Sequence, residues 1–94
     1  MSGTKLDGSD MKGADLRKAN AANASFVGTS LRGAYLTDAD VVDADFRGAD
    51  LRGTDMRAVN LDRGVLTGAH ADANTIWPPE LDAARRHELG VVET

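Results

Sequence analysis

The sequence predicts an all-β solenoid, in which the chain winds into stacked square coils, followed by a short C-terminal helix. Apolar residues recur every five positions from Leu6 to Ile76, small residues precede them by two positions, and glycines recur every twenty. A helix repeats its apolar face every 3.6 residues and a flat strand every two, so a five-residue period requires a different backbone path. The period is that of an internal repeat.

The glycine spacing sets the size of one coil. Gly8, Gly28, Gly48 and Gly68 lie twenty residues apart, so four five-residue units make one turn of the solenoid. Each unit is expected to be a short extended step followed by a corner. The two-residue alternation of a strand then directs the apolar centre and the small residue inward, and stacked coils pair about 4.8 Å apart.

The corners are predicted to be of two kinds. Glycine in the third place of a turn, as at Gly48, supplies the positive φ of a type II turn. Two corners of each coil carry this glycine, whereas the other two mostly carry residues such as Lys18, Asn23 or Asp38. We therefore expect type II corners on two sides of the coil and type I-like corners on the other two.

The inward centres are predicted to stack into four apolar ladders, one on each side of the square. The ladders are Leu6, Phe26, Phe46 and Leu66; Met11, Leu31, Leu51 and Ala71; Leu16, Leu36, Met56 and Ile76; and Ala21, Val41 and Leu61. A coil in such a stack is stabilised mainly by the neighbours that cover it.

The repeat unit also resembles that of a known family. The stretches "ADLRK", "ADFRG", "ADLRG" and "VNLDR" match the consensus A(D/N)LXX of the pentapeptide-repeat proteins, and the match covers residues 4–78. The resemblance implies a right-handed quadrilateral β-helix of just under four coils. The twenty-residue coil agrees with that fold, whereas the handedness rests on the resemblance alone.

A helix is predicted after the last repeat. Two consecutive prolines stop the strand, and the apolar spacing then becomes helical. We expect a repeat domain over residues 4–78, a capping helix over 79–89 and a tail over 90–94. The residues expected to close the bottom of the core are Trp77, Leu81 and Leu89.

The N-terminal end has no comparable plug, because only Met1, Ser2 and Gly3 precede the first repeat. An uncovered coil presents unpaired N–H and C=O groups that invite pairing with another strand. The first coil is therefore expected to be exposed, covered by a partner or stacked on a second copy. A homodimer through a solenoid end is one hypothesis, and the alternative contact for it is the capped end, through Val91 and Val92.

Composition limits the classes of function. The chain has no cysteine, which excludes a disulfide framework and thiolate chemistry. No stretch approaches the roughly twenty apolar residues of a membrane span, and the first residues lack the apolar run of a secretory signal. We therefore expect a cytoplasmic protein with no membrane interaction.

Catalysis and cofactor binding are not expected. Neither His70 nor His87 lies beside a nucleophile or a paired carboxylate at a suitable spacing. A metal site of His70 and Asp72 with His87 or Glu88 is the alternative, but two solvated histidines are the simpler interpretation. The glycines follow the corners rather than a G-x-G-x-x-G or Walker pattern. We predict no enzymatic activity, no metal and no cofactor.

The charge balance weighs against nucleic-acid binding, which needs a net basic stripe with aromatic residues. Some members of the resembled family are acidic rods that mimic DNA and bind DNA gyrase. This chain has a formal charge of −4, and an aspartate before a centre is commonly matched by an arginine after it, as in Asp45 and Arg47. A DNA-mimic modulator of gyrase or another topoisomerase, giving drug tolerance or self-protection, is therefore the alternative function.

The leading hypothesis is a non-enzymatic scaffold that binds a protein partner of unknown identity. Its candidate interaction face combines acidic residues of the fourth side with outward apolar and aromatic side chains. These candidates are Asp40, Asp43, Asp62, Ala22, Val42 and Tyr35. A third hypothesis is a capped fragment or minimal example of the fold with no partner of its own.

Overall fold

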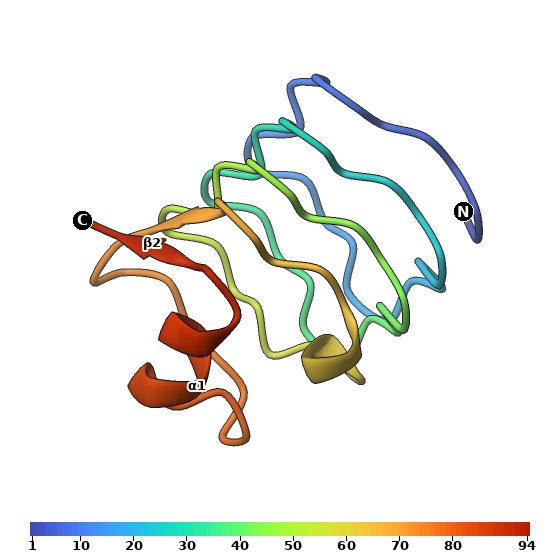
Figure 1. Cartoon of the computed structure of the whole chain (residues 1–94). Coiled ribbons are helices and arrows are strands. Elements are labelled where there is room, and N and C mark those ends of the chain that lie inside the picture. The colour runs from blue at the N-terminus through green and yellow to red at the C-terminus, as the bar shows by residue number, and fades with distance from the viewer.

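The chain winds into a stack of coils, and the computed structural model describes all of residues 1–94 (Figure 1). Parallel bridges join successive coils along each side of the stack, as from Lys5 to Ser25 and from Ser25 to Asp45. Apart from Val59, each bridged residue is the outward one just before an inward apolar centre, and we call this place the bridge position. Most bridges join residues twenty positions apart, so one coil spans about twenty residues.

Regular elements are short because each side of a coil is only a brief extended step. They are the 3₁₀ helix η1 (Leu61–Arg63), strand β1 (His70–Ala71), helix α1 (Ala83–Glu88) and strand β2 (Val92–Glu93). β1 and β2 pair in parallel, and both α1 and β2 lie at the end of the stack opposite the N-terminus (Figure 1).

The C-terminal helix is shorter than predicted. We expected residues 79–89, whereas α1 covers Ala83–Glu88. The Asp82 carboxylate accepts a hydrogen bond from the Arg85 backbone N–H at 2.8 Å, so this aspartate is the N-cap and the helix begins after it. Leu81, which precedes the cap, is buried in the core instead of lying in the helix.

The segment after α1, expected as a tail over residues 90–94, forms hydrogen bonds with the last coil. The Val92 N–H donates to the Ala69 carbonyl at 2.7 Å, and the Thr94 N–H donates to the Ala71 carbonyl at 3.0 Å. β2 therefore covers part of the backbone edge of the last coil.

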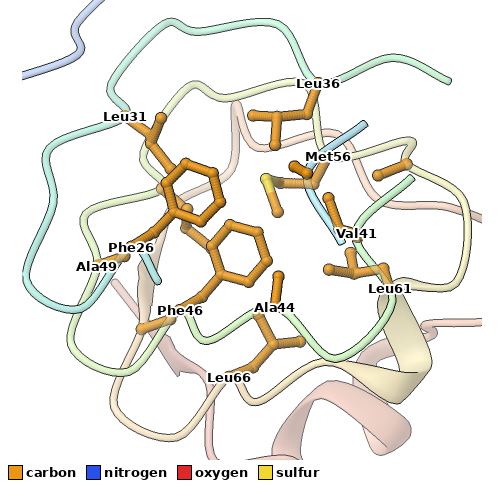
Figure 2. Close-up of a cluster of buried hydrophobic side chains, with 14 of the residues drawn as sticks. Phe26, Leu31, Leu36, Val41, Ala44, Phe46, Ala49, Met56, Leu61 and Leu66 are labelled. Atoms are coloured by element: carbon orange, nitrogen blue, oxygen red, sulfur yellow. The ribbon is translucent and has the colours of Figure 1, made fainter. Parts of the chain in front are cut away.

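Apolar centres fill the inside of the stack (Figure 2). The rings of Phe26 and Phe46 stack with centroids 4.9 Å apart. The ladder residues with at most 1% exposure are Ala21, Phe26, Leu31, Leu36, Val41, Phe46, Leu51, Met56, Leu61, Leu66 and Ala71. Three ladder residues of the first coil, Leu6, Met11 and Leu16, are only partly buried. The difference arises because no further coil lies above them.

The corners depart from the prediction. Lys18, Asn23, Asp38 and Asp43 have φ angles of 62°, 59°, 61° and 57°. A type II turn requires positive φ at this place and a type I turn does not, so the expected type I-like corners are wrong at these positions. Asparagine and aspartate tolerate the left-handed region better than most residues. Bonds between coils hold the corner as well, since the Lys18 N–H donates to the Thr37 carbonyl at 3.0 Å.

The five-residue period first slips at Val59. This residue, rather than Asn60, bridges Asp40. Ala58 occupies a corner place that elsewhere holds glycine or a residue with positive φ, a conformation that alanine disfavours. Ala58 instead turns inward, Val59 points outward with 48% exposure, and η1 supplies the residue that restores the register.

A second slip overturns the core assignment of Ile76. Ile76 occupies the bridge position below Asp55, one residue later than a strict count of twenty. Its side chain is 46% exposed, whereas Thr75 before it is buried, so the prediction that Ile76 is a core centre is wrong. Trp77, the residue after Ile76, packs against the core instead.

Candidate interaction surface

Repeated aspartate–arginine pairs cover much of the outside of the stack. In each pair the arginine two residues after a bridge-position aspartate folds back onto its carboxylate, with N···O distances of 2.7–2.8 Å. The pairs are Asp15–Arg17, Asp45–Arg47, Asp50–Arg52 and Asp55–Arg57. Each carboxylate also accepts a hydrogen bond from the backbone N–H of its arginine, which fixes the start of the corner.

These pairs keep the carboxylates ionised. Hydrogen bonds from the Arg17 side chain lower the pKa of Asp15 to about 2, and those from the Arg57 side chain lower the pKa of Asp55 to about 2. The Thr37 hydroxyl donates a further bond of 2.9 Å to Asp55. Each guanidinium neutralises its carboxylate locally, so the surface is strongly polar without being strongly acidic.

One outward column differs because two exposed apolar side chains interrupt it. Bridges connect Asp15, Tyr35, Asp55 and Ile76 along one side of the stack, and we call these four residues the Tyr35 column. Tyr35 is 51% exposed and Ile76 is 46% exposed, whereas Asp55 between them is buried. The column therefore offers an aromatic and an aliphatic contact, with an ion-paired carboxylate between them.

The Tyr35 side chain lines a shallow, open depression. The depression has a volume of about 360 Å³ and is lined by Gly13, Asp15, Arg17 and Tyr35. Small-molecule sites generally enclose most of their ligand. This hollow is open, so it suits contact with another surface better than capture of a small molecule.

The predicted interaction face is divided between two sides of the stack. Tyr35 lies on one side of the stack. The other five predicted residues belong to repeat units that are stacked on the next side. These five are Asp40, Asp43, Asp62, Ala22 and Val42. The Asn60 side-chain amide donates to the Asp40 carboxylate at 3.3 Å and links two coils there. Val59, also on this side, adds an exposed apolar side chain, although it occupies the first, small-residue place of the unit VNLDR.

The histidines do not form a site. His70 lies in β1 and His87 in α1, and both are exposed. No group of three or more histidine, cysteine, aspartate and glutamate side chains is arranged to hold a metal ion. No helix has the length and apolar character needed to cross a membrane.

Comparisons with known proteins identify the repeat. The family model described as pentapeptide repeats matches residues 1–33 and 29–68, with eight copies. The crystal structure of alr5209, a pentapeptide repeat protein from Nostoc Pcc 7120, is 35% identical with a TM-score of 0.73. That match covers 96% of this chain and 76% of the other. The search of curated proteins found no match.

A second solved structure is AT2G44920, a pentapeptide repeat protein from the Arabidopsis thaliana thylakoid lumen. It is 33% identical with a TM-score of 0.37, and the match covers 82% of this chain and 60% of the other. The family-model match covers more than half of the present chain, and alr5209 shares its fold as a repeat β-helix. The chain therefore belongs to the pentapeptide-repeat family.

Proposed function

We propose that this chain is a non-enzymatic, cytoplasmic scaffold that presents the Tyr35 column to a protein partner. The observation that carries the proposal is the exposure of Tyr35 and Ile76 within a single bridged column. Tyrosine is enriched at protein interfaces because its ring offers a large apolar contact and its hydroxyl a polar one.

The backbone under this column is held firmly. The Tyr35 N–H donates to the Ala14 carbonyl at 2.9 Å, and the Tyr35 carbonyl accepts from the Leu16 N–H at 2.8 Å. The next residue, Leu36, is fully buried. A side chain on such a backbone loses little conformational freedom on binding, which favours affinity from a small contact area.

The proposal includes a right-handed quadrilateral coil, as the family resemblance implies, and a capping role for α1. Contacts of α1 with Trp77, at the end of the repeats, and with the buried Leu81 support the cap. The Arg86 guanidinium lies 5.2 Å from the centre of the Trp77 ring, and Arg86 Nη1 donates to the Leu81 carbonyl at 2.8 Å. The cap keeps the lower end of the scaffold from pairing with other strands.

Affinity capture from extracts of the source organism tests the scaffold function. We expect the wild-type chain to retain a specific protein whose recovery falls about tenfold with Tyr35→Ser, the order of loss typical of an interface aromatic. The matched control is Val65→Ser, which removes an apolar side chain of similar exposure, 42%, from another side of the stack. Equal recovery with wild type and Tyr35→Ser would contradict the proposal.

A gyrase-directed DNA mimic is supported less well by this surface. Mimicry of duplex DNA needs a continuous negative surface, whereas the carboxylates of Asp15, Asp45 and Asp50 are each paired with an arginine. A gyrase supercoiling assay, with and without a quinolone, separates the two functions. We expect no effect at high molar excess, and inhibition or drug rescue at micromolar protein would favour the mimic.

A further inference from the structure

Backbone groups along the N-terminal edge of the stack have no partner. In the second coil each bridge-position N–H donates to the coil above, as from Ser25 to the Thr4 carbonyl at 2.8 Å. The equivalent residues of the first coil are Lys5, Asp10, Asp15 and Asn20, and neither their backbone N–H groups nor their carbonyls form a hydrogen bond. Each of these residues therefore offers a free donor and a free acceptor.

The same end leaves the top of the core uncovered. Leu6, Met11 and Leu16 are only partly buried, and Met1 beside them is 40% exposed. An unpaired strand edge beside an apolar interior favours pairing with another chain. The C-terminal end cannot supply that cover, because α1 and β2 already lie against the last coil (Figure 1). A head-to-tail stack of copies is therefore blocked.

We propose that this edge binds a second copy of the chain head to head, through two-fold symmetric antiparallel strand pairing. A two-fold axis across the solenoid reverses the strand direction, so the numbers of facing residues add to a constant. One coil spans twenty residues. When the numbers of two facing residues add to 20, the first coil of one copy therefore lies one strand spacing from the first coil of the other. Lys5 then faces Asp15 of the second copy, and Asp10 faces its own counterpart on the axis.

This register pairs three of the four free bridge positions and leaves only Asn20, which faces no residue of the second copy. In an antiparallel ladder, alternate facing residues exchange both N–H···O=C bonds. Lys5, Asp10 and Asp15 each have both groups free, so all three can form such pairs. The charge match is also favourable, since Lys5 faces an aspartate at two symmetric places, where it would share the Asp15 carboxylate with Arg17 of the same chain as that aspartate. The facing Asp10 carboxylates are the one repulsive contact.

The core residues are complementary in size in the same register. Each half-buried centre of one copy faces a small inward residue of the other, so the apolar interior continues across the contact without overlap. The facing residues are Leu6 with Ala14, Met11 with Ser9, and Leu16 with Thr4.

Neighbouring registers are less favourable. If the numbers of facing residues add to 15, Lys5 pairs with Asp10, but Asp15 faces no residue of the second copy. A sum of 25 puts the second copy where the first residues of the chain already lie, since the Gly3 N–H donates to the Ala22 carbonyl at 2.9 Å. The size of the end limits the affinity. The two shorter extents of the whole molecule, 22 and 19 Å, limit this end to roughly half of the ~800 Å² that each partner buries in a standard interface, so the dimer should exchange with monomer.

Sedimentation velocity of the 94-residue chain, from about 1 μM to about 1 mM, tests this dimer across the range expected of a small interface. We expect reversible dimerisation that Lys5→Asp weakens about tenfold, because two attractive contacts become repulsive. Asp15→Lys should weaken it similarly, and the double variant should restore it to within about threefold. Asp10→Asn should tighten the dimer, because it removes the repulsion on the axis.

The matched control is Arg63→Asp, which makes the same change in charge on η1, away from the first coil. Circular dichroism of each variant verifies that the chain is folded. A wild-type chain that stays monomeric at the highest concentration would overturn the proposal. So would a dimer that responds equally to Lys5→Asp and Arg63→Asp, because such a dimer would use a different surface.

Discussion

The two ends of the solenoid show how one ladder behaves with and without a cover. Leu6 and Leu66 are both predicted centres of the same ladder, but Leu66 has 1% exposure whereas Leu6 is only partly buried. At the C-terminal end, Leu81 and Val91 are buried and β2 pairs with the last coil. The difference follows from position and not from residue type, as expected for a stack in which each coil depends on its neighbours.

A charged residue in the middle of the stack is expected to have the largest effect. Phe46→Asp would place a carboxylate without a partner beside Phe26, where the side chains are fully buried, and should abolish the cooperative melting transition. Leu6→Asp, at the open end, should leave a folded protein, because water can reach the carboxylate. Thermal melts followed by circular dichroism compare the two, and a normal transition for Phe46→Asp would show that the centres do not point inward.

Truncating a leucine to alanine at each end of the stack measures how much the C-terminal cover contributes to the free energy of unfolding. Leu81→Ala should lower the free energy of unfolding by about 2–4 kcal/mol, because it leaves a cavity beneath the last coil. Leu6→Ala should lower it by about 1 kcal/mol, because the side chain is already partly in water. Urea titrations of both variants give the difference, and equal losses would contradict the contrast between the ends.

The corners can be tested in both directions. Gly48 has φ 67° and open space where a Cβ would lie, so Gly48→Ala should cost about 1–2 kcal/mol from backbone strain alone. Asp43 has φ 57°, and Asp43→Gly should be neutral or slightly stabilising because glycine accepts this conformation. Chemical denaturation distinguishes them, and a stabilising Gly48→Ala would show that the corner conformation is different.

The ion pairs predict how stability depends on pH. Arg57 lowers the pKa of Asp55 to about 2, below the ordinary aspartate value of 3.8. The ionised carboxylate is thus favoured in the folded chain, so its stabilisation is fully present above about pH 4 and is lost as the pH falls towards 2. Melting temperatures of wild type and Asp55→Asn across this range provide the test. The variant should lose less stability than wild type, and parallel curves would argue against the pair.

An exposed arginine should have the smallest effect. Arg47→Ala removes the partner of Asp45 but no buried group, and exposed pairs contribute about 0–1 kcal/mol. We expect a change in the free energy of unfolding within about 0.5 kcal/mol. A loss comparable to that of Leu81→Ala in the same urea titration would mean that these pairs, and not the ladders, hold the stack together.

The repeat and its family were predictable from the sequence because each unit repeats the same requirements. A small residue and a large apolar residue must face inward, and the resemblance drawn from that pattern is confirmed by the family match. The outward place of Tyr35 follows from the same count, since it precedes the centre Leu36.

The register slips were not predictable by counting in fives. At Ala58 the backbone avoids positive φ, and the compensation in η1 depends on Asn60 with φ 63°. A count in fives that continues through both slips puts Val59 and Ile76 at inward places, whereas both side chains are exposed. The positive φ at Asp38 is also not predictable from the residue type alone. Bonds between coils impose the corner on residues that do not favour it by themselves.

Amide hydrogen exchange, followed residue by residue by NMR, tests the contrast between the ends most directly. In dilute protein we expect the amides of Lys5 and Asp15 to exchange freely, and those of Tyr35, Val92 and Thr94 to be protected by their bonds to neighbouring coils. Protection of Lys5 and Asp15 should appear only as dimer forms. Protection of these two amides in the monomer, or free exchange at Val92 and Thr94, would contradict a solenoid that is open at one end and covered at the other.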